Sequence, residues 1–378
     1  MNIVLSDNGL HDNFSPITLT RALGDVRMGI FTPKERWLRI FQDAHVYFDT
    51  VSYLQEKYLT HDQVDLYLNA AVIGGEELVS CVKAMDSDDI LMDGDVWIAK
   101  KGKGNQIVHY KGESLVHLTH RWDLYLQNDT VLRWDFQLVS HQGVSQKLSS
   151  SNTLIGDPSQ IFLEEGAVVE GSTINTKTGP VYIGKNAEVM EGCLIRGGLA
   201  LLEDAALKMG AKIYGACTFG PHCKIGGEVS NSIFQGYSNK GHDGFVGNSL
   251  IGEWCNLGAD TNTSNLKNNY SKVATYSYAE KSMQQTDVQF MGLSMGDHSK
   301  CGINTMFNTA TVVGVSSNVF GADFPDKYIP SFSWGGSEGF QDFIFEKALE
   351  FNNNMMARRG LSLSEAEIGI LRYLHQHK

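Results

Sequence analysis

The segment from Asn239 to Tyr270 gathers side chains that could do chemistry: NKGHDGFVGNSLIGEWCNLGADTNTSNLKNNY. It contains one histidine, His242, two lysines, Lys240 and Lys267, and many asparagines. A neutral imidazole can accept a proton near neutral pH, and an ammonium group can hold an anionic substrate. We therefore take this segment as the first candidate site and ask which elements position it.

Large apolar residues recur every six positions before the segment, and a smaller residue stands four positions after most of them. The large residues are Ile183, Val189, Ile195, Leu201, Leu207, Ile213, Phe219 and Ile225. The second set is Ala187, Cys193, Leu199, Ala205, Ala211, Cys217, Cys223 and Val229. A six-residue repeat is typical of a parallel β-helix, in which three hexads close a triangular coil. Stacked coils lie about 4.8 Å apart.

The six-residue rhythm begins at Leu163, resumes at Phe245 after an interruption, and continues from Met295 to Val319. We predict that loops leave the prism at about 226–244 and 262–292. A solenoid contacts only neighbouring coils, so it can tolerate such loops, and loops often carry function. The polar segment lies across both predicted loops.

Three domains follow from the pattern. Residues 1–150 alternate strands with helices, one of them opened by Thr32, Pro33 and Glu35, and predict an α/β domain with a mainly parallel sheet. Residues 151–335 form the β-helix. Residues 336–378 predict two helices, one running to Gly360 and one opened by Ser364.

Composition excludes several classes of protein. The formal charge of −12 disfavours a nucleic-acid partner, because binding phosphate backbones needs clustered Lys and Arg. The sequence has no basic leader and no long apolar run, so we expect a cytoplasmic protein that binds no membrane. Five of the six cysteines occupy the repeat's small-residue position and none forms a CxxC, which indicates packed thiols rather than disulfides.

Long motifs resemble a known family. They are PITLTRALGDVRMGIFTPKERW, GPVYIGKNAEVMEGCLIRGG, GGEVSNSIFQGYSNKGHDGFVGNSLIGEWCNLGADTNTSNLKNNY, GLSMGDHSKCGINTMFNTATVVG and IPSFSWGG. The chain resembles, over nearly all its length, the bacteroidete variant of the bifunctional UDP-N-acetylglucosamine pyrophosphorylase and glucosamine-1-phosphate N-acetyltransferase family. The resemblance implies a Rossmann-like, nucleotidyltransferase-like α/β domain followed by a left-handed parallel β-helix and a C-terminal helical segment.

The same resemblance implies chemistry and partners. The β-helix would transfer an acetyl group from acetyl-CoA to an amino-sugar phosphate, and the α/β domain would use a nucleoside triphosphate with Mg²⁺. The expected assembly is a homotrimer, in which each donor site is shared by two chains.

Site residues follow by position in the motifs. His242 matches the family's catalytic base, Asn256 a residue that contacts the acceptor sugar, and Asn265 a residue near the acyl donor. The family's Tyr is replaced here by Phe245, which removes a hydroxyl that could bind sugar phosphate. The resemblance therefore does not fix glucosamine-1-phosphate as the acceptor.

The cations that hold the acceptor phosphate in the family have no clear equivalents here. Lys212, Lys240 and Lys267 could replace them.

In the α/β domain the usual glycine-rich phosphate loop is missing, because only Gly9 follows the first strand. The stretch SPITLTR is similar to the sequence after that loop, so Arg21, Arg27 and Lys34 are candidate phosphate ligands. They could equally be solvated or ion-paired basic side chains.

The metal site is unknown. The strand end that should carry a metal-binding aspartate has Asn69, and Asp93 and Asp95 fit a hairpin turn better than a magnesium site.

Two other functions are considered. One is a non-catalytic protein that keeps both folds and binds sugar nucleotides or a partner, which the missing glycine loop and metal acid favour. The other is a zinc enzyme of the carbonic anhydrase kind, which would need His222, His242 and His298 to converge on one metal. Their separation along the chain argues against it.

Overall fold

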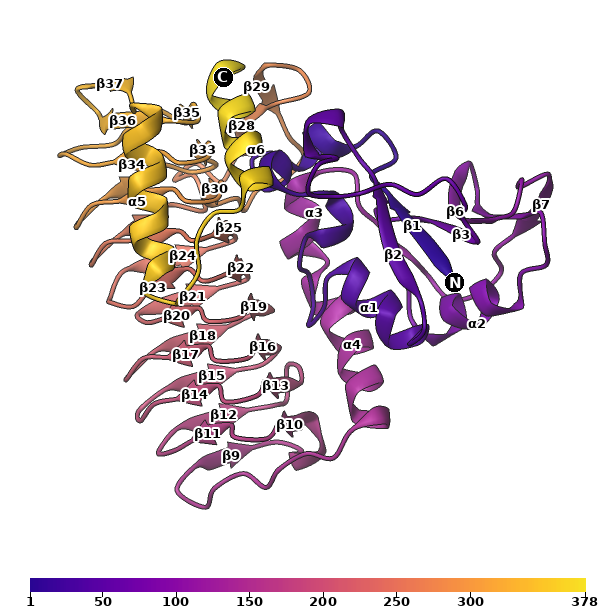
Figure 1. Cartoon of the computed structure of the whole chain (residues 1–378). Helices are drawn as coiled ribbons and strands as arrows, with labels where there is room; N and C mark the ends of the chain where they lie inside the picture. Colours follow the sequence, from indigo (N-terminus) through magenta and orange to yellow (C-terminus); the bar gives the residue numbers. More distant parts are fainter.

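The computed structural model describes residues 1–378 and contains an α/β domain, a parallel β-prism and two C-terminal helices (Figure 1). The prism stands upright beside the α/β domain, and helix α4 runs along the side of the prism that faces that domain. No helix of the chain combines the length and the apolar character that a bilayer crossing requires.

The α/β domain is built on a six-stranded sheet in the order β2-β1-β3-β6-β5-β7. Five of the six strands run in one direction, and only β6 runs antiparallel to its neighbours β3 and β5, so the sheet is mainly parallel with one reversed strand. The strands are β1 Asn2–Ser6, β2 His45–Asp49, β3 Leu66–Asn69, β5 Asp89–Asp93, β6 Val96–Lys101 and β7 Gln106–His109. A short pair, β4 Val72–Ile73 and β8 Val116–His117, lies apart from this sheet.

Helices α1 Pro33–Ile40, α2 Glu76–Ala84, α3 Arg121–Leu126 and α4 Asn128–Gln142 complete the domain. The predicted capping box of α1 is confirmed: the Thr32 hydroxyl accepts from the Glu35 N–H at 3.1 Å, and the Glu35 carboxylate accepts from the Thr32 N–H at 2.9 Å. Reciprocal capping satisfies two backbone donors that a helix start leaves free.

The prism has three parallel faces, which we number in the order in which the chain visits them. The first face consists of β10 Ile161–Leu163, β13 Val181–Ile183, β16 Leu199–Leu201, β19 Cys217–Phe219, β22 Ile233–Gly236, β25 Leu250–Glu253, β30 Ser294–Met295, β33 Val312–Val313 and β35 Tyr328–Ile329. The second consists of β11 Val168–Val169, β14 Glu188–Val189, β17 Ala206–Leu207, β20 Lys224–Ile225, β23 Asn239–Lys240, β26 Asn256–Leu257, β31 Lys300–Cys301, β34 Asn318–Val319 and β36 Ser333–Gly336, with β37 Gly339–Asp342 added antiparallel.

The third face consists of β9 Thr153–Ile155, β12 Thr173–Asn175, β15 Leu194–Arg196, β18 Lys212–Tyr214, β21 Glu228–Ser230 and β24 Phe245–Gly247, and is extended by the pair β27 Asn262–Thr263 and β32 Met306–Phe307. The large residues of the repeat line one continuous core, which confirms the hexapeptide prediction. Each coil stacks its apolar residue on the one below, as Ile225 does on Leu207.

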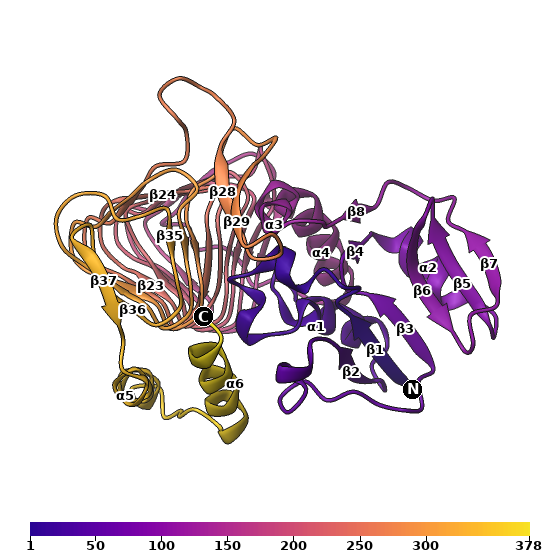
Figure 2. The ribbon, with the colours of Figure 1, turned by 90° about the horizontal axis from the view of Figure 1, so that it is seen from above.

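The first predicted loop is wrong, because residues 226–244 stay inside the prism as β21, β22 and β23. A regular coil takes 18 residues, as from Leu207 to Ile225, whereas Ile225 pairs with Lys240 only 15 residues later. Shortened coils break the six-residue rhythm without extruding the chain. The second predicted loop is confirmed: β28 Ala274–Ser277 and β29 Ser282–Gln285 form an antiparallel hairpin outside the prism (Figure 2).

Helix α5 Phe345–Ala357 runs along the prism, and α6 Glu365–Gln376 lies between the prism and the α/β domain (Figures 1 and 2). Asn352 of α5 donates to the Ser316 hydroxyl at 3.1 Å, and Tyr373 of α6 stacks on Tyr53 at 4.4 Å between ring centroids. The predicted capping box at Ser364 is confirmed. The two helices therefore bind both larger domains together.

Candidate functional site

The first part of the polar segment, residues 239–244, forms an edge of the prism, where the second face turns into the third. His242 lies in the turn between β23 and β24, and its side chain is exposed. Asn256 starts β26 one coil above, directly over Asn239, and is half-buried. This edge, which we call the His242 edge, presents the predicted base and the predicted sugar-binding amide on adjacent coils.

Lys240 does not present its ammonium group at this edge. Its side chain is 1% exposed, and it occupies the inward position that Ile225 fills in the coil below. The ammonium donates to the carbonyl oxygens of His242 at 2.7 Å and Asp243 at 3.0 Å. Burial lowers the pKa of Lys240 to about 8. Lys240 thus braces the turn that carries His242, and its substrate-binding role stays a prediction that this geometry does not favour.

Asn265 and Lys267 lie at another edge. The Asn265 amide donates to the Asn248 side chain at 2.8 Å, and Asn248 follows β24 whereas His242 precedes it. The length of a strand therefore separates Asn265 from His242 within one chain. The Lys267 ammonium donates to the Lys272 carbonyl at 3.0 Å. A single chain places His242 and Asn256 on adjacent coils, but it places Asn265 and Lys267 at another edge.

The two remaining candidates of the prism lie on the third face. Lys212 is exposed in β18, in register with Glu228 of the next coil. Phe245 is half-buried, and its N–H donates to the Asn262 side chain at 2.8 Å. Neither side chain belongs to the second face, where Asn256 lies.

The prism histidines do not converge. His222 stacks on Tyr237 at 4.7 Å and lies 3.7 Å from Asp204, at the edge between the first and second faces. His298 is buried, and burial lowers its pKa to about 3. No group of three or more His, Cys, Asp or Glu side chains in the chain could hold a metal ion. The residues do not fit the zinc interpretation.

Arg21, a predicted phosphate ligand, instead ties the α/β domain to the prism. Its guanidinium is 5% exposed and forms ion pairs with Asp297 and, at 3.2 Å, with Glu253. Burial opposes the charged form, but the charges of Asp297 and Glu253 outweigh it, so the pKa of Arg21 is raised.

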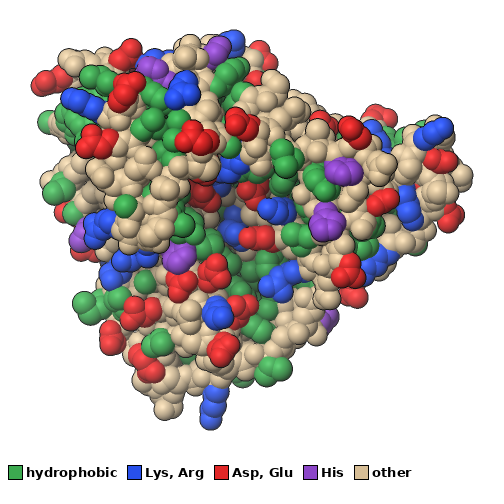
Figure 3. Space-filling view, in the orientation of Figure 1, with side chains coloured by type: hydrophobic (Ala, Val, Ile, Leu, Met, Phe, Trp, Pro, Cys, Tyr) green, Lys and Arg blue, Asp and Glu red, His purple; other side chains and the backbone are tan.

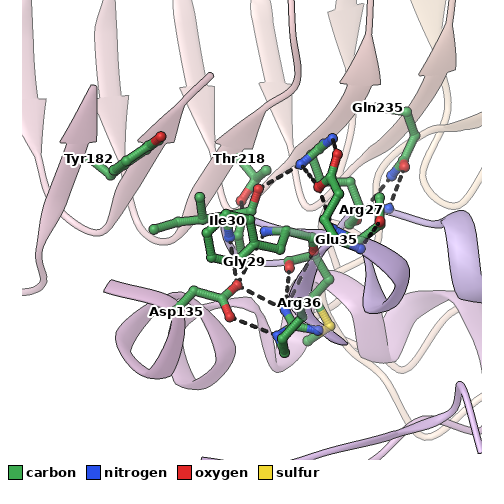
Figure 4. Close-up of polar contacts among 12 residues, drawn as sticks. Arg27, Gly29, Ile30, Glu35, Arg36, Asp135, Tyr182, Thr218 and Gln235 are labelled. Carbon is green, nitrogen blue, oxygen red and sulfur yellow. Dashed lines mark hydrogen bonds and ion pairs between the residues drawn. The ribbon is translucent and has the colours of Figure 1, made fainter. Parts of the chain in front are cut away.

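Arg27 makes a similar junction (Figure 4). It forms two bonds of 2.7 Å to Glu35, and its backbone exchanges hydrogen bonds with the side chain of Gln235 in the first face. Burial would raise the pKa of Glu35, but the charge of Arg27 and its hydrogen bond lower it. Lys34 is half-buried, 5.9 Å from the centre of the Phe48 ring. Carboxylates of the chain already pair with Arg21 and Arg27, and the role of the three cations as phosphate ligands stays a prediction.

The α/β domain has a different hollow that the sequence did not reveal. A cavity of about 420 Å³ lies beside the carboxyl ends of β1 and β2 and extends over β3 and β6. Its lining includes Asn8 and Gly9 after β1, Asp49 at the end of β2, and Trp97 and Lys100 of β6. Ligands of open α/β sheets bind outside the carboxyl ends of strands. We call it the sheet-end cavity.

Polar contacts hold the walls of the sheet-end cavity. The Ser6 hydroxyl donates to Asp49 at 2.8 Å, and the Trp97 indole donates to Asn8 at 2.8 Å. The Lys100 ammonium lies 4.3 Å from the centre of the Trp97 ring. Sequence reasoning missed Trp97 and Lys100 because only the antiparallel pairing of β6 with β3 brings them to this edge.

The loop after β1 is pinned by side chains. Asp7, which follows β1, is 3% exposed; it bonds to the His11 ring at 2.9 Å and accepts from the Leu23 N–H at 2.8 Å. At the neighbouring strand end the amide of Asn69 donates to the Trp97 carbonyl at 3.0 Å. Asp93 lies at the predicted hairpin turn between β5 and β6, which is confirmed, and bonds to His117 at 2.7 Å.

The fold defines a class: an α/β domain joined to a parallel β-prism of hexapeptide repeats. Residues 3–143 match the family described as "Sugar nucleotidyl transferase". The chain is 22% identical over 226 residues to the bifunctional protein GlmU of Synechococcus elongatus, covering 54% of this chain and 45% of that protein. It is 37% identical over 87 residues to the bifunctional protein GlmU of Methanocaldococcus jannaschii, covering 23% and 21%. The chain thus spans less than half the length of these relatives.

Among solved structures, the polysialic-acid-specific acetyltransferase NeuO resembles 51% of this chain over 87% of its own, at 12% identity and a TM-score of 0.30. The similarity by sequence thus links residues 3–143 to sugar nucleotidyl transferases.

Proposed function

We propose that the chain is a transferase of nucleotide-sugar synthesis, as in the bacteroidete variant of the bifunctional family. In this proposal the prism transfers an acetyl group from acetyl-CoA to the amine of an amino-sugar phosphate. The observation that carries the proposal is the exposed imidazole of His242, held by a braced turn in the coil next to that of Asn256. The sugar nucleotidyl transferase match of residues 3–143 supports the same pathway class.

His242 would act as the general base. Most of a sugar amine is protonated at neutral pH, and only the neutral amine attacks a thioester. The nitrogen would bond to the thioester carbonyl carbon while the carbon–sulfur bond breaks. The proton accepted by the imidazole would then pass to the leaving thiolate, so His242 returns to its neutral form.

A homotrimer would supply what one chain lacks. Asn265 lies a strand length from His242, so a second copy would have to bring its own donor edge to the His242 edge. Exposed apolar side chains on and beside the third face support such packing: Leu194 is 53% exposed and Met209 is 72% exposed. Light scattering of the purified protein tests this directly, and a monomer at working concentration would contradict it.

The α/β domain would bind a nucleoside triphosphate in the sheet-end cavity. Trp97 offers an aromatic face and Lys100 a cation for phosphate. Asp49 is the carboxylate that would hold Mg²⁺, which binds through one or two carboxylates together with substrate phosphates and water.

A test of acyl transfer uses acetyl-CoA, a panel of amino-sugar phosphates and detection of free thiol. His242→Ala should lower turnover about 100-fold or more, because a positioned base contributes about that factor. His222→Asn is the matched control: it removes an imidazole elsewhere in the prism, and Asn tolerates the positive φ of 58° found there. Undiminished thiol release by a folded His242→Ala protein would remove His242 from this role.

A second function, a binder of sugar nucleotides without nucleotidyl transfer, is favoured by one observation. The loop after β1 is pinned through Asp7, and Arg21 and Arg27 are neutralised by carboxylates rather than free for phosphate. Pyrophosphate release from UTP or dTTP with a sugar-1-phosphate and Mg²⁺ separates the two. Release supports the enzyme, whereas nucleotide binding without release supports the binder.

A further inference from the structure

Four cations on the second face of the prism have no anionic partner. They are Lys208, Lys224, Arg358 and Arg359, which we call the cationic surface, and none of them belongs to an ion pair of the chain. The chain has 43 acidic residues against 31 Lys and Arg, so a group of unpaired cations is not what its average composition would produce. Figure 3 shows Lys and Arg side chains gathered near the lower end of α5.

Helix α5 delivers two of the four charges to the face. Arg358 and Arg359 directly follow the helix, and the Arg359 guanidinium donates to the His222 carbonyl at 3.4 Å. Lys224 begins β20 two residues after His222 and is exposed. Partial burial lowers the pKa of Lys224, and the charges of Arg359, Lys208 and Arg358 lower it further.

The cationic surface extends across the second face, from Arg359 beside His222 at one edge toward the His242 edge at the other. Lys224 is in register with Asn239, which is in register with Asn256, so the three side chains form one ladder on the outside of the second face. Lys208 stands below Gly226, since its N–H donates to the Ile225 carbonyl at 2.7 Å.

Two glycines let the coil below pack closely against the turn that carries His242. A Cβ at Gly226 would lie 2.6 Å from the Gly241 carbonyl oxygen, and one at Gly227 would lie 2.8 Å from the His242 carbonyl oxygen. Both positions therefore need glycine, and the backbone beneath His242 carries no side chain there. The acids of this edge, Asp243 and Asp260, are both exposed and lie in the turns toward the third face.

The guanidinium and ammonium groups of the cationic surface indicate which class of ligand it would bind. Guanidinium and ammonium groups together recognise phosphate, through forked hydrogen bonds from Arg and point charges from Lys. A nucleic acid would need a longer basic stripe than four residues in a protein of net charge −12. A single phosphate group or a pyrophosphate fits the size of the surface.

We propose that the cationic surface binds a phosphate group of a substrate whose other end reacts at His242. The proposal rests on the acyl transfer proposed above. The phosphate belongs either to the amino-sugar phosphate or to coenzyme A, because both substrates of that reaction carry one. Lys240 and Lys267, which the sequence suggested for this task, are respectively buried and at another edge.

Binding without turnover tests the proposal. Calorimetric titrations would compare glucosamine-1-phosphate with glucosamine, and acetyl-CoA with acetyl-pantetheine, on the wild-type protein and on Lys224→Gln/Arg358→Gln. The double variant should bind the relevant phosphorylated compound about tenfold or more weakly, since charge-assisted bonds are lost. Its affinity for the compound without phosphate should not change. Lys185→Gln is the control, because Lys185 is an exposed prism lysine in the turn between β13 and β14.

The titrations with the acceptor and with the donor give separate answers. Weaker binding of glucosamine-1-phosphate alone assigns the surface to the acceptor, and weaker binding of acetyl-CoA alone assigns it to the donor. Equal affinities of the wild-type protein and the double variant for both phosphorylated compounds would overturn the proposal, as would a wild-type protein that binds neither. Phosphate-dependent binding without any thiol release would leave the surface in place and overturn the acyl transfer. If instead the protein releases thiol and the double substitution leaves KM unchanged, only the proposal for the cationic surface is overturned.

Discussion

Lys240 shows how a charged residue can occupy a position that the repeat reserves for an apolar one. Phe234, Lys240 and Val246 follow one another at six-residue spacing, so the pattern contained the signal that Lys240 points inward. The exposure of His242 next to it could be predicted from the turn-like sequence around it. The ion pairs of Arg21 could not, because its partner Asp297 lies 276 residues away along the chain.

The buried ammonium of Lys240 predicts a pH-dependent stability. Its pKa of about 8 in the folded protein lies below the ordinary value of 10.5, so the unfolded chain binds more protons between these values. Stability should therefore rise with pH from about 8 to about 10.5. In Lys240→Met this rise should be smaller, and turnover should fall about tenfold or more, because the turn carrying His242 loses its two donor contacts.

Urea denaturation across this pH range measures the difference. Lys300, whose pKa burial also lowers to about 8, contributes to the rise in both proteins and cancels in the comparison. Lys185→Met controls for loss of an exposed lysine. Identical slopes in the wild-type protein and in Lys240→Met would contradict the buried-charge interpretation.

The sequence predicted those secondary-structure elements that depend on local residue patterns. It did not predict those that depend on pairing between strands. The hexad strands and the capped starts of α1 and α6 were predictable, since spacing and capping residues act locally. Residues 336–344 were predicted as the start of a helix, which is wrong. Gly335 and Gly339 take φ of 150° and 120°, and the antiparallel pairing of β36 with β37 forms there instead.

Helix α4 takes part in one buried ion pair and one exposed ion pair, which can be compared directly. Asp135 is 1% exposed and accepts from the Arg36 guanidinium at 2.7 and 2.8 Å and from the Ile30 N–H at 2.9 Å (Figure 4). Asp129 pairs with Arg133 on the exposed side of the helix at 2.8 Å. Removing one partner of a buried pair leaves a buried charge, whereas a surface pair is screened by water.

Asp135→Asn should therefore lower the free energy of unfolding by about 3–5 kcal/mol. Asp129→Asn should lower it by less than about 1 kcal/mol. Denaturant titration of both variants measures the two values under one condition. A similar loss in the two variants would show that α4 does not anchor the loop before α1 through Asp135.

At the scale of the whole molecule, the α/β domain, the prism and the C-terminal helices are joined by buried polar contacts. Thr20 and Arg21 of the α/β domain both bind Asp297 of the prism, and Asn128 donates to Thr218 of the first face at 3.1 Å. The order of domains could be predicted from periodicity, but not this junction. Residues that lie far apart in the sequence form this junction, and they belong to no periodic pattern.

Arg21 decides between the two roles considered for it. If it joins the domains, Arg21→Met leaves Asp297 buried without its cation and should lower the free energy of unfolding by about 3–5 kcal/mol. Asp297→Leu combined with Arg21→Met should recover part of that loss, because it removes the unpaired buried charge but leaves the Thr20 hydroxyl and the Glu253 N–H without their acceptor. Denaturant titration gives both values, and UTP binding by each folded variant should match that of the wild-type protein. If Arg21→Met keeps its stability and instead loses UTP affinity, Arg21 is a phosphate ligand as the sequence motif suggests. In that case the two domains must separate for the nucleotide to reach it, since its guanidinium is closed off in the junction.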